Sequence, residues 1–340
     1  MTMPRAPRWS FDVSQADWVK DGLDDLTTGT VSSIVPAGFD AYARILHPVE
    51  TPLNGDRLVR WEEVADWGGQ VLTAQSQWLA IAMPEVKPDQ PRPWRSQGPQ
   101  QGSLFVNDAR SLAAIAGRFT DTPHHCCCIW EGFGWWSRSR LVAPGQLAPP
   151  PPPTPIPIEA KDWLKVHTRY RDYFLYKESL DMPSSFVAAI EVLEGHSPNL
   201  WWPSDHVWCV GTEIDFDSTY VGGSKLFIDA ILQSEELEAF EVGPRDSTSA
   251  DLPEWIVRVV GRTVDELLST GRAAVVTSIG RIHFELERPG RLHRGLFRYE
   301  IDSDGDRGGS GQSPLSKSSD VDLRRQLEFH VGYGLRSVAN

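Results

Sequence analysis

Three carboxylates at every second position are the side chains of this chain best suited to catalysis or metal binding. Glu213, Asp215 and Asp217 lie in the segment VWCVGTEIDFDS, which predicts a strand. Residues two apart in a strand point to the same side, so the acids would share one face, and Ile214 and Phe216 the other. Such a row could hold Mg²⁺ or Mn²⁺, since hard cations take oxygen ligands, and two-metal nucleases and phosphotransferases use this chemistry.

A simpler interpretation of the same segment is a half-exposed strand with a solvated acidic face. The apolar side would then set the register of the strand. A functional site also needs a second element that supplies a base or a further ligand, and the sequence singles out none. Glu213, Asp215 and Asp217 are therefore a hypothesis for catalytic or metal-binding residues, to be tested by mutation.

Tryptophan is the second unusual feature, with 14 residues in the chain. Four of them, Trp130, Trp201, Trp202 and Trp208, could line a pocket for a small ligand. The alternative is a tryptophan-rich core, because this side chain buries a large area and finds a partner for its indole N–H inside the protein.

His124, His125 and the run Cys126 to Cys128 invite comparison with a metal cluster, but their spacing argues against one. Structural zinc sites use ligand pairs separated by about two to four residues, usually from two loops. On a strand, Cys126 and Cys128 would face one way and Cys127 the other, so the thiols cannot converge. We expect small buried cysteines in a core strand, and no histidine can be assigned to a catalytic thiol.

Common catalytic signatures are absent from the sequence. It contains no G-x-S-x-G, G-x-x-x-x-G-K-[ST], G-x-G-x-x-G or H-E-x-x-H motif. Asp302 to Asp306 begins like a calcium loop, but Arg307 stands where glycine is needed and Ser313 where glutamate is needed. Whether the protein is an enzyme stays open, and no cofactor is predicted except Mg²⁺ or Mn²⁺ under the acid-row hypothesis.

The charge of the chain indicates its class of partner. Its 33 basic and 46 acidic side chains give a net charge of −13, and no dense basic cluster provides the phosphate attraction behind most nucleic-acid affinity. Acidic surfaces favour basic protein partners.

The amino terminus lacks the apolar segment of a signal peptide, and no apolar run is long enough to span a bilayer. The cysteine run fits a reducing compartment, so we expect a cytoplasmic protein that binds neither nucleic acid nor membrane.

Residue periodicity predicts an α+β fold, mainly an antiparallel sheet with flanking helices, as one body or as two closely packed lobes. Residues 31–49 are expected to form two strands around a turn. We expect helices over 61–67, from Asn107 or Asp108, from 184 or 185, from Ser224, and over 263–269. Asn107 or Asp108, and Ser224, are candidate caps before apolar stripes. Alternating residues predict three late strands, in AAVVTSI, RIHFELE and GLFRYEI.

The expected organisation is one globular unit with short additions. Residues 1–30 are a lead-in, residues 31–301 the unit, and residues 302–340 a flexible Ser/Gly/Asp-rich segment and tail. The Pro-rich stretch 144–157 contains five consecutive prolines and predicts an extended polyproline II segment. It would serve as a hinge or as an inserted loop.

Three segments resemble those of a family of uncharacterised actinobacterial proteins. They are VPAGFDAYARILHP from Val35, CIWEGFGWW from Cys128, and NLWWPSDHVWCVGTEIDFDSTYVGGS from Asn199. The resemblance spreads over most of residues 31–224 and implies one architecture on both sides of the proline run, which favours the inserted loop. It implies no activity, cofactor or functional residue.

Acidic charge, many aromatic residues and missing catalytic signatures favour a non-catalytic protein-interaction or accessory protein, of an immunity-like kind. One alternative is a metal-dependent hydrolase or phosphotransferase that uses the acid row. Another is a small-ligand-binding protein with a tryptophan-lined pocket. The sequence identifies neither the partner nor the oligomeric state.

Overall fold

The structure is a computed structural model whose described residues form an α+β fold, as the sequence predicts. They are residues 8–50, 57–86, 88–94, 98–133, 165–179, 195–248, 254–276, 281–287, 295–303, 306–315, 323–324, 326–328 and 331. The Pro-rich stretch 144–157 and the helix expected from residue 184 or 185 lie outside this set.

Two compact units are interleaved along the chain. Unit 1 consists of residues 1–47 and 100–249, and unit 2 of residues 48–99 and 250–340. These boundaries differ from the single unit expected over 31–301. The amino-terminal lead-in belongs to unit 1, where Arg8 and Trp9 pair with a strand of the main sheet.

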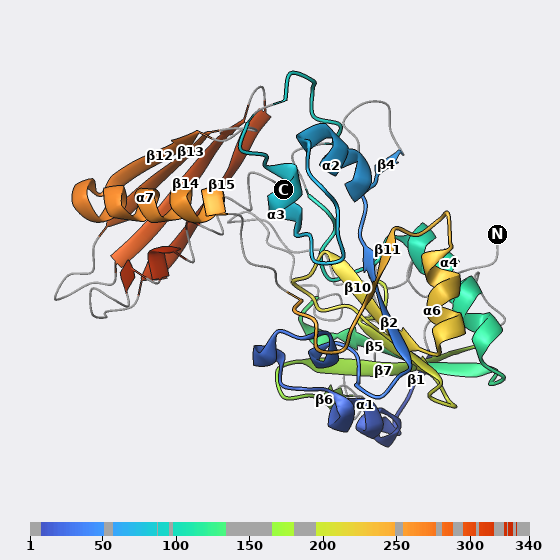
Figure 1. Ribbon diagram of the computed structural model, residues 1–340. Helices are drawn as coiled ribbons and strands as arrows, with labels where there is room; N and C mark the ends of the chain where they lie inside the picture. Colours follow the sequence, from blue (N-terminus) through green and yellow to red (C-terminus); the bar gives the residue numbers. More distant parts are fainter. Residues whose placement is uncertain are drawn as a thin grey trace, which may run out of the picture. The chain divides into compact units, whose positions relative to one another are not determined.

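Unit 1 is built on a nine-stranded antiparallel sheet (Figure 1). Its strands follow one another in space as β1 (Arg8–Trp9), β7 (Asp172–Ser179), β5 (His124–Trp130), β8 (Leu200–Pro203), β9 (Trp208–Gly211), β10 (Ser218–Gly223), β2 (Ala41–Leu46) and β11 (Ala239–Val242), with β6 (Lys165–His167) paired to β7.

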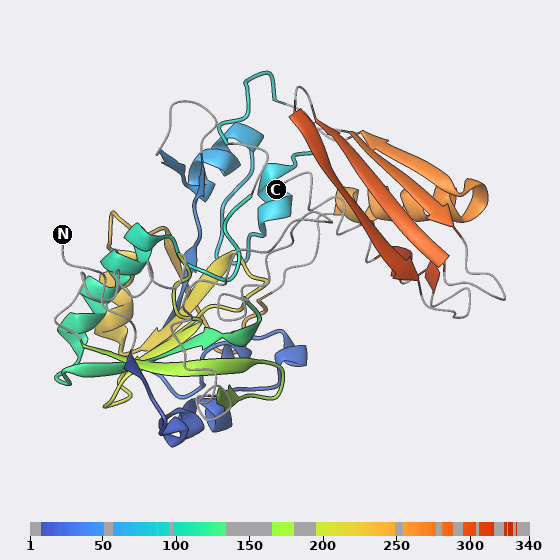
Figure 2. The same ribbon diagram turned by 180° about the vertical axis from the view of Figure 1, so that it is seen from behind.

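Both faces of the sheet are covered at its centre, since every residue of β8 and β9 is buried. The helices α4 (Val106–Ala116) and α6 (Lys225–Leu232) lie on one side and α1 (Asp17–Gly22) on the other (Figures 1 and 2). Short 3-10 helices complete the unit: η1 (Val13–Ala16), η2 (Leu26–Thr28), η3 (Val31–Ser33), η4 (Gly117–Phe119) and η5 (Glu131–Phe133).

The core of unit 1 lies between the sheet and helices α4 and α6. Apolar residues of strand and helix meet there, including Ala43, Leu112, Trp201, Trp208 and Phe227. Burial of such side chains contributes about 1.5–3 kcal/mol each. The predicted stripe of α4 is confirmed at Leu112, Ile115 and Ala116, although neither Asn107 nor Asp108 caps the helix, whose N-cap is Phe105 without a side-chain bond.

The first of the two strands expected over 31–49 is wrong, because Val31–Ser33 forms η3. The backbone N–H groups of Val31 and Ser32 donate to the carbonyls of Asp246 and Pro244, at 3.0 and 2.9 Å. These bonds to a distant segment take the place of a sheet ladder. Val31, Ile34 and Val35 are buried, as their apolar side chains predict, but the backbone here forms a 3-10 helix and not a strand.

Unit 2 contains a helix followed by a four-stranded antiparallel meander. These elements are α7 (Glu254–Thr270), β12 (Arg272–Val276), β13 (Arg281–Glu287), β14 (Gly295–Ser303) and β15 (Asp306–Leu315), with the strands adjacent in chain order. The helix α7 crosses one face of the sheet (Figure 1). Its buried stripe, Ile256, Val260, Val264 and Leu267, matches the buried strand positions such as Phe284 and Phe297.

The inserted segment 48–99 of unit 2 has an aromatic cluster of its own. It carries β3 (Val49–Glu50), β4 (Leu58–Val59), α2 (Trp61–Gly68) and α3 (Trp78–Ala82). Trp78 packs against Trp61 and Trp94, each at 5.4 Å between ring centroids. Such aromatic pairs add about 0.5–1.5 kcal/mol beyond their buried area.

Two expectations for unit 2 need correction or extension. Residues 302–340 were expected to be flexible, yet β15 runs from Asp306 to Leu315 along β14. The helix expected over 263–269 is α7, which begins at Glu254.

Across the described residues, none of the helices has both the length and the apolar character needed to cross a membrane.

Candidate functional site

The three carboxylates of the predicted acid row lie in a turn. Strand β9 ends at Gly211, and the backbone N–H of Phe216 donates to the carbonyl of Glu213 at 3.0 Å. The strand prediction is therefore wrong beyond Gly211. Residues 212–216 bond to crossing segments: Thr212 N–H donates to Asn199 O at 2.7 Å, and Gly102 N–H donates to Phe216 O at 2.9 Å.

Arginines hold these carboxylates at two separate places. Glu213 is buried and accepts two bonds on Oε1 from Arg171, at 2.6 Å from Nη2 and 3.2 Å from Nε. Asp215 is exposed and accepts from Arg171 Nη2 at 3.1 Å. Asp217 lies instead beside Arg44, at 3.8 Å. The three acids thus do not converge on one point.

Electrostatics around Glu213 are those of a buried ion pair. Burial raises the pKa of Glu213, while the hydrogen bonds and charge of Arg171 oppose that rise. The guanidinium of Arg171 also lies 5.9 Å from the ring centroid of Trp130. Arg171 thus anchors the turn between β9 and β10 onto the start of β7. Its guanidinium bonds to Glu213 and also lies over the ring of Trp130.

A second polar chain joins β2, β10 and the segment after residue 99. Arg44 is buried and its Nε donates to Ser218 Oγ at 3.0 Å. His47 bonds through Nδ1 to the carbonyl of Gln100 at 2.6 Å, and through Nε2 to Thr219 Oγ1 at 2.9 Å. Burial lowers the pKa of His47 to about 4, so the imidazole is neutral in the folded protein at pH 7. His47 therefore ties the two ends of the inserted segment to each other.

The four candidate tryptophans lie in different environments. Trp201 and Trp208 pack edge to face at 5.3 Å in the core under α4 and α6. Trp202, next to Trp201 in the strand, contacts Trp18 at 5.9 Å, on the opposite face. Trp130 contacts Phe133 at 5.2 Å. Trp201, Trp202 and Trp208 are each at most 1% exposed, so the core interpretation describes them.

The cysteine run lies in β5, as expected. Cys127 belongs to the core under the helices, and the alternation of a strand puts Cys126 and Cys128 on the other face. Burial raises the pKa of Cys126 to about 11 and raises the pKa of Cys128 and Cys209 as well. High pKa values disfavour the nucleophilic thiolate. Over the described ranges, no group of three His, Cys, Asp or Glu side chains is placed to hold a metal ion.

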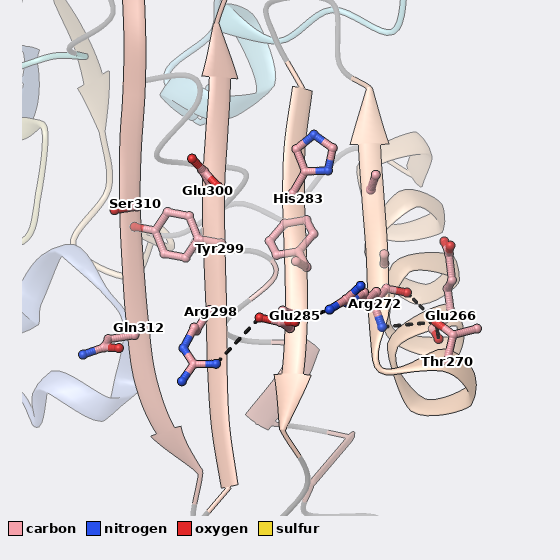
Figure 3. A pocket seen from close by; sticks show the side chains of 13 residues that line it. Glu266, Thr270, Arg272, His283, Glu285, Arg298, Tyr299, Glu300, Ser310 and Gln312 are labelled. Atoms are coloured by element: carbon pink, nitrogen blue, oxygen red, sulfur yellow. Dashed lines mark hydrogen bonds and ion pairs between the residues drawn. The ribbon is translucent and has the colours of Figure 1, made fainter.

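The sheet of unit 2 carries a polar hollow of about 1080 Å³ (Figure 3). It lies over the face opposite the buried positions, where every second strand residue is polar or small, and it extends to Glu266 and Thr270 of α7. The lining side chains on this face are Arg272, Ala274, His283, Glu285, Arg298, Glu300, Ser310 and Gln312. We call this set the open face.

One row of the open face is held by ion pairs. Arg272 Nη2 and Nε donate to Glu285 Oε1 at 3.0 and 3.2 Å, and Arg298 Nη1 lies 3.7 Å from Glu285 Oε2. Figure 3 shows these three side chains next to one another across β12, β13 and β14. Directly opposite charges of this kind stabilise a sheet by about 0.2–1 kcal/mol per pair.

Sequence reasoning assigned these strands but missed the open face as a surface. The signal was present in RIHFELE and GLFRYEI, where polar residues alternate with apolar ones. Alternation alone predicts a solvated face. The cross-strand register, which sets Glu285 opposite Arg298 and His283 opposite Glu300, is not contained in the pattern of either strand.

Comparisons with known proteins found no match to the chain among protein-family models, curated proteins or solved structures. The resemblance to an actinobacterial family therefore stays a prediction.

Proposed function

We propose that this chain is a non-catalytic, immunity-like accessory protein that binds a basic protein partner through an acidic edge of unit 1. The observation that carries the proposal is the distribution of acids around strand β11. Asp229, Glu235, Glu236, Glu238 and Glu241 lie on α6, on β11 and between them. We call these five residues the acidic edge.

The overall charge of unit 1 supports this choice. Unit 1 contains 26 of the 46 acidic residues and 15 of the 33 basic residues of the chain. A field of one sign raises the association rate of an oppositely charged partner. Lys225 is the basic residue of the α6–β11 segment, and its Nζ already bridges Asp229 and Glu241, at 2.7 and 3.1 Å.

Strand β11 supplies the backbone part of the proposed interface. Within the described part of unit 1 it is the terminal strand of the sheet, paired on one side with β2. An edge strand offers N–H and C=O groups to an extended segment of another protein. Leu226, 74% exposed on α6, adds an apolar contact next to the acids.

Charged residues on a sheet edge also have a protective use, since they keep edges of different molecules from pairing. This protective role requires only that the acidic edges of two molecules repel each other. Binding of a basic segment requires in addition that the backbone of β11 accepts a new strand, which gives the two uses different experimental signatures.

The test uses the full chain and a defined probe, an extended peptide of alternating lysine and threonine, with a glutamate–threonine peptide as its control. We expect the lysine peptide alone to bind, with slower amide exchange at Ala239 to Val242 and weaker binding at high salt. The triple variant Glu235→Lys, Glu236→Lys, Glu241→Lys should abolish binding.

A matched variant, Asp21→Lys, Asp121→Lys, Asp205→Lys, makes the same charge change at three exposed acids outside β11 and the strand paired with it. It should keep most of the binding. Equal losses in the two triple variants, or binding without any change in exchange at β11, would show that charge alone attracts the peptide and would refute the proposed edge.

Two further parts of the proposal concern its setting. A cytoplasmic location is supported by four free, buried cysteines, which suit a reducing compartment. A partner that is protein and not nucleic acid is supported by the acidic balance of the chain.

A further inference from the structure

The open face of unit 2 leaves a second surface whose partner the proposed function does not supply. Helix α7 covers the other face of the sheet, and Figure 2 shows the four strands in front of α7. Arg272, His283, Arg298 and Glu300 are exposed in the described structure. A face so rich in polar groups needs no apolar cover, so its partner must be argued from charge.

The register arranges the open face as two rows of four. The first row is Arg272, Glu285, Arg298, Gln312, and the second row is Ala274, His283, Glu300, Ser310. In each row the two central strands, β13 and β14, carry groups that attract each other. Glu285 lies opposite Arg298, and His283 lies opposite Glu300.

The second row is incompletely satisfied within the chain. Among the residues that the structure describes, neither His283 nor Glu300 makes a side-chain hydrogen bond or ion pair, in contrast to Arg272, Glu285 and Arg298 in the first row. A carboxylate gains most from a cationic or hydrogen-bonding group of another molecule when none of its own chain serves it.

We propose that the open face binds the open face of a second copy of this chain, about a two-fold axis that runs parallel to the strands between β13 and β14. Such an axis places β13 of one copy over β14 of the other, and β12 over β15. Glu285 then faces Arg298 of the second copy, and His283 faces its Glu300. Every one of these contacts occurs twice.

Charge complementarity follows from the register and the symmetry together. Two unlike groups opposite each other on neighbouring strands become self-complementary when a two-fold axis lies between those strands. The outer strands β12 and β15 are also compatible with this axis, since Arg272 would face Gln312 and the small Ala274 would face the small Ser310. Facing sheets pack about 10 Å apart, a distance that side chains of the length of arginine and glutamate span.

The dimer is expected to be weak. Four strands spaced about 4.8 Å apart, with roughly seven residues each, present roughly 400 Å² per copy, against about 800 Å² in a standard stable interface. A polar interface of this size predicts a dissociation constant in the micromolar range, and strong weakening by salt.

Complementary charge reversal tests the axis. In Glu285→Arg, two arginines would face each other, and in Arg298→Glu, two glutamates would. Each substitution acts twice across the axis, so each variant alone should weaken dimerisation of the full chain at least about tenfold. An equimolar mixture of the two variants restores both contacts and should form a heterodimer, detected by analytical ultracentrifugation with one variant fluorescently labelled.

A triple variant, Arg272→Glu with Glu285→Arg and Arg298→Glu, protects the test against simple misfolding. It keeps both ion pairs of position 285 within the chain, with their charges exchanged, and keeps the contacts across the axis, so it should dimerise like the wild type. Two results would overturn the proposal: a wild-type chain that stays monomeric at low salt up to about 200 µM, or single variants that fail to form the heterodimer on mixing. Neither readout involves the basic partner, so the outcome is independent of the acidic edge.

Discussion

Arg171 is the side chain on which the turn between β9 and β10 most depends. It supplies both hydrogen bonds to Glu213 Oε1 and one to Asp215. Glu213 is 6% exposed, so loss of the guanidinium would leave a buried carboxylate without its cation. Removing one partner of a buried ion pair is far more costly than removing both.

We predict that Arg171→Met destabilises unit 1 by about 2 kcal/mol, below the usual cost for a fully buried pair because the Arg171 side chain is 25% exposed. The double variant Arg171→Met, Glu213→Gln should recover most of that loss. Hydrogen exchange at the amides of β9 and β10 gives the measurement.

Asp215→Asn is the control for this prediction, because the Asp215 side chain is 74% exposed and exposed pairs contribute about 1 kcal/mol or less. Equal protection of the β9 and β10 amides in wild type and Arg171→Met would contradict the anchoring role. It would also return Glu213 to consideration as a reactive carboxylate.

Among the helices, α6 has the clearest local cause. Ser224 precedes it with extended backbone, and its Oγ accepts the N–H of Phe227 at 3.3 Å. Buried Phe227, Ile228 and Ile231 then hold the helix on the sheet. An N-cap of this kind contributes about 1 kcal/mol, and α6 carries part of the acidic edge.

We therefore predict that Ser224→Ala lowers the stability of unit 1 by about 1 kcal/mol, whereas Ser224→Asp, which keeps an acceptor at the cap, changes it little. Denaturant unfolding followed by tryptophan fluorescence would report the difference. A Ser224→Ala protein as stable as wild type would mean that packing alone sets the start of α6.

Elements with a repeating pattern were predictable from sequence, and those held by distant backbone were not. Ser224 before an apolar stripe predicted α6, and alternation predicted β13 and β14. Val31–Ser33 carries a strand-like composition, yet its N–H groups bond to Asp246 and Pro244. Strand β15, rich in glycine and serine, has no alternation to reveal it and exists through its ladder with β14.

The same limit applies to the site residues. Burial of Trp201, Trp202 and Trp208 could be anticipated from residue type. The pairing of Glu213 with Arg171 could not, because the two residues come together only through the sheet order in which β7 and β9 lie on either side of β5 and β8. A spacing of two in the acids suggested a strand face, whereas backbone bonds with Gly102 and Asn199 hold the segment as a turn.

Acid should destabilise unit 1 through its buried histidines. Burial lowers the pKa of His47 to about 4 and that of His125 to about 3. The unfolded chain binds these protons near pH 6.5, so it holds more protons than the folded protein between the two values. Stability is then fully present above about pH 6.5 and is lost as the pH falls towards 4.

Each histidine should account for a loss of about 2 kcal/mol between pH 7 and pH 5. His47→Gln would lower stability at pH 7, through its altered bonds to Gln100 and Thr219, but should remove about half of the pH dependence. Denaturant unfolding at both pH values measures this. An unchanged slope in His47→Gln would show that His47 binds protons equally in the folded and unfolded chains over this pH range, and would contradict the lowered pKa.

The interleaving of the units has a consequence for the newly made chain. Residues 48–99 leave the ribosome long before residues 250–340, which complete unit 2. At typical rates of about 5–20 residues per second, the delay is roughly 10–30 s. During that time residues 48–99 lack the carboxy-terminal part of their unit. Unit 1 can fold before residues 250–340 are made. The bond between His47 and Gln100 then holds the two ends of segment 48–99 together, so that the segment forms a loop.

Nascent chains stalled after residue 249 should therefore recruit chaperones to residues 48–99, and release of the finished chain should displace them.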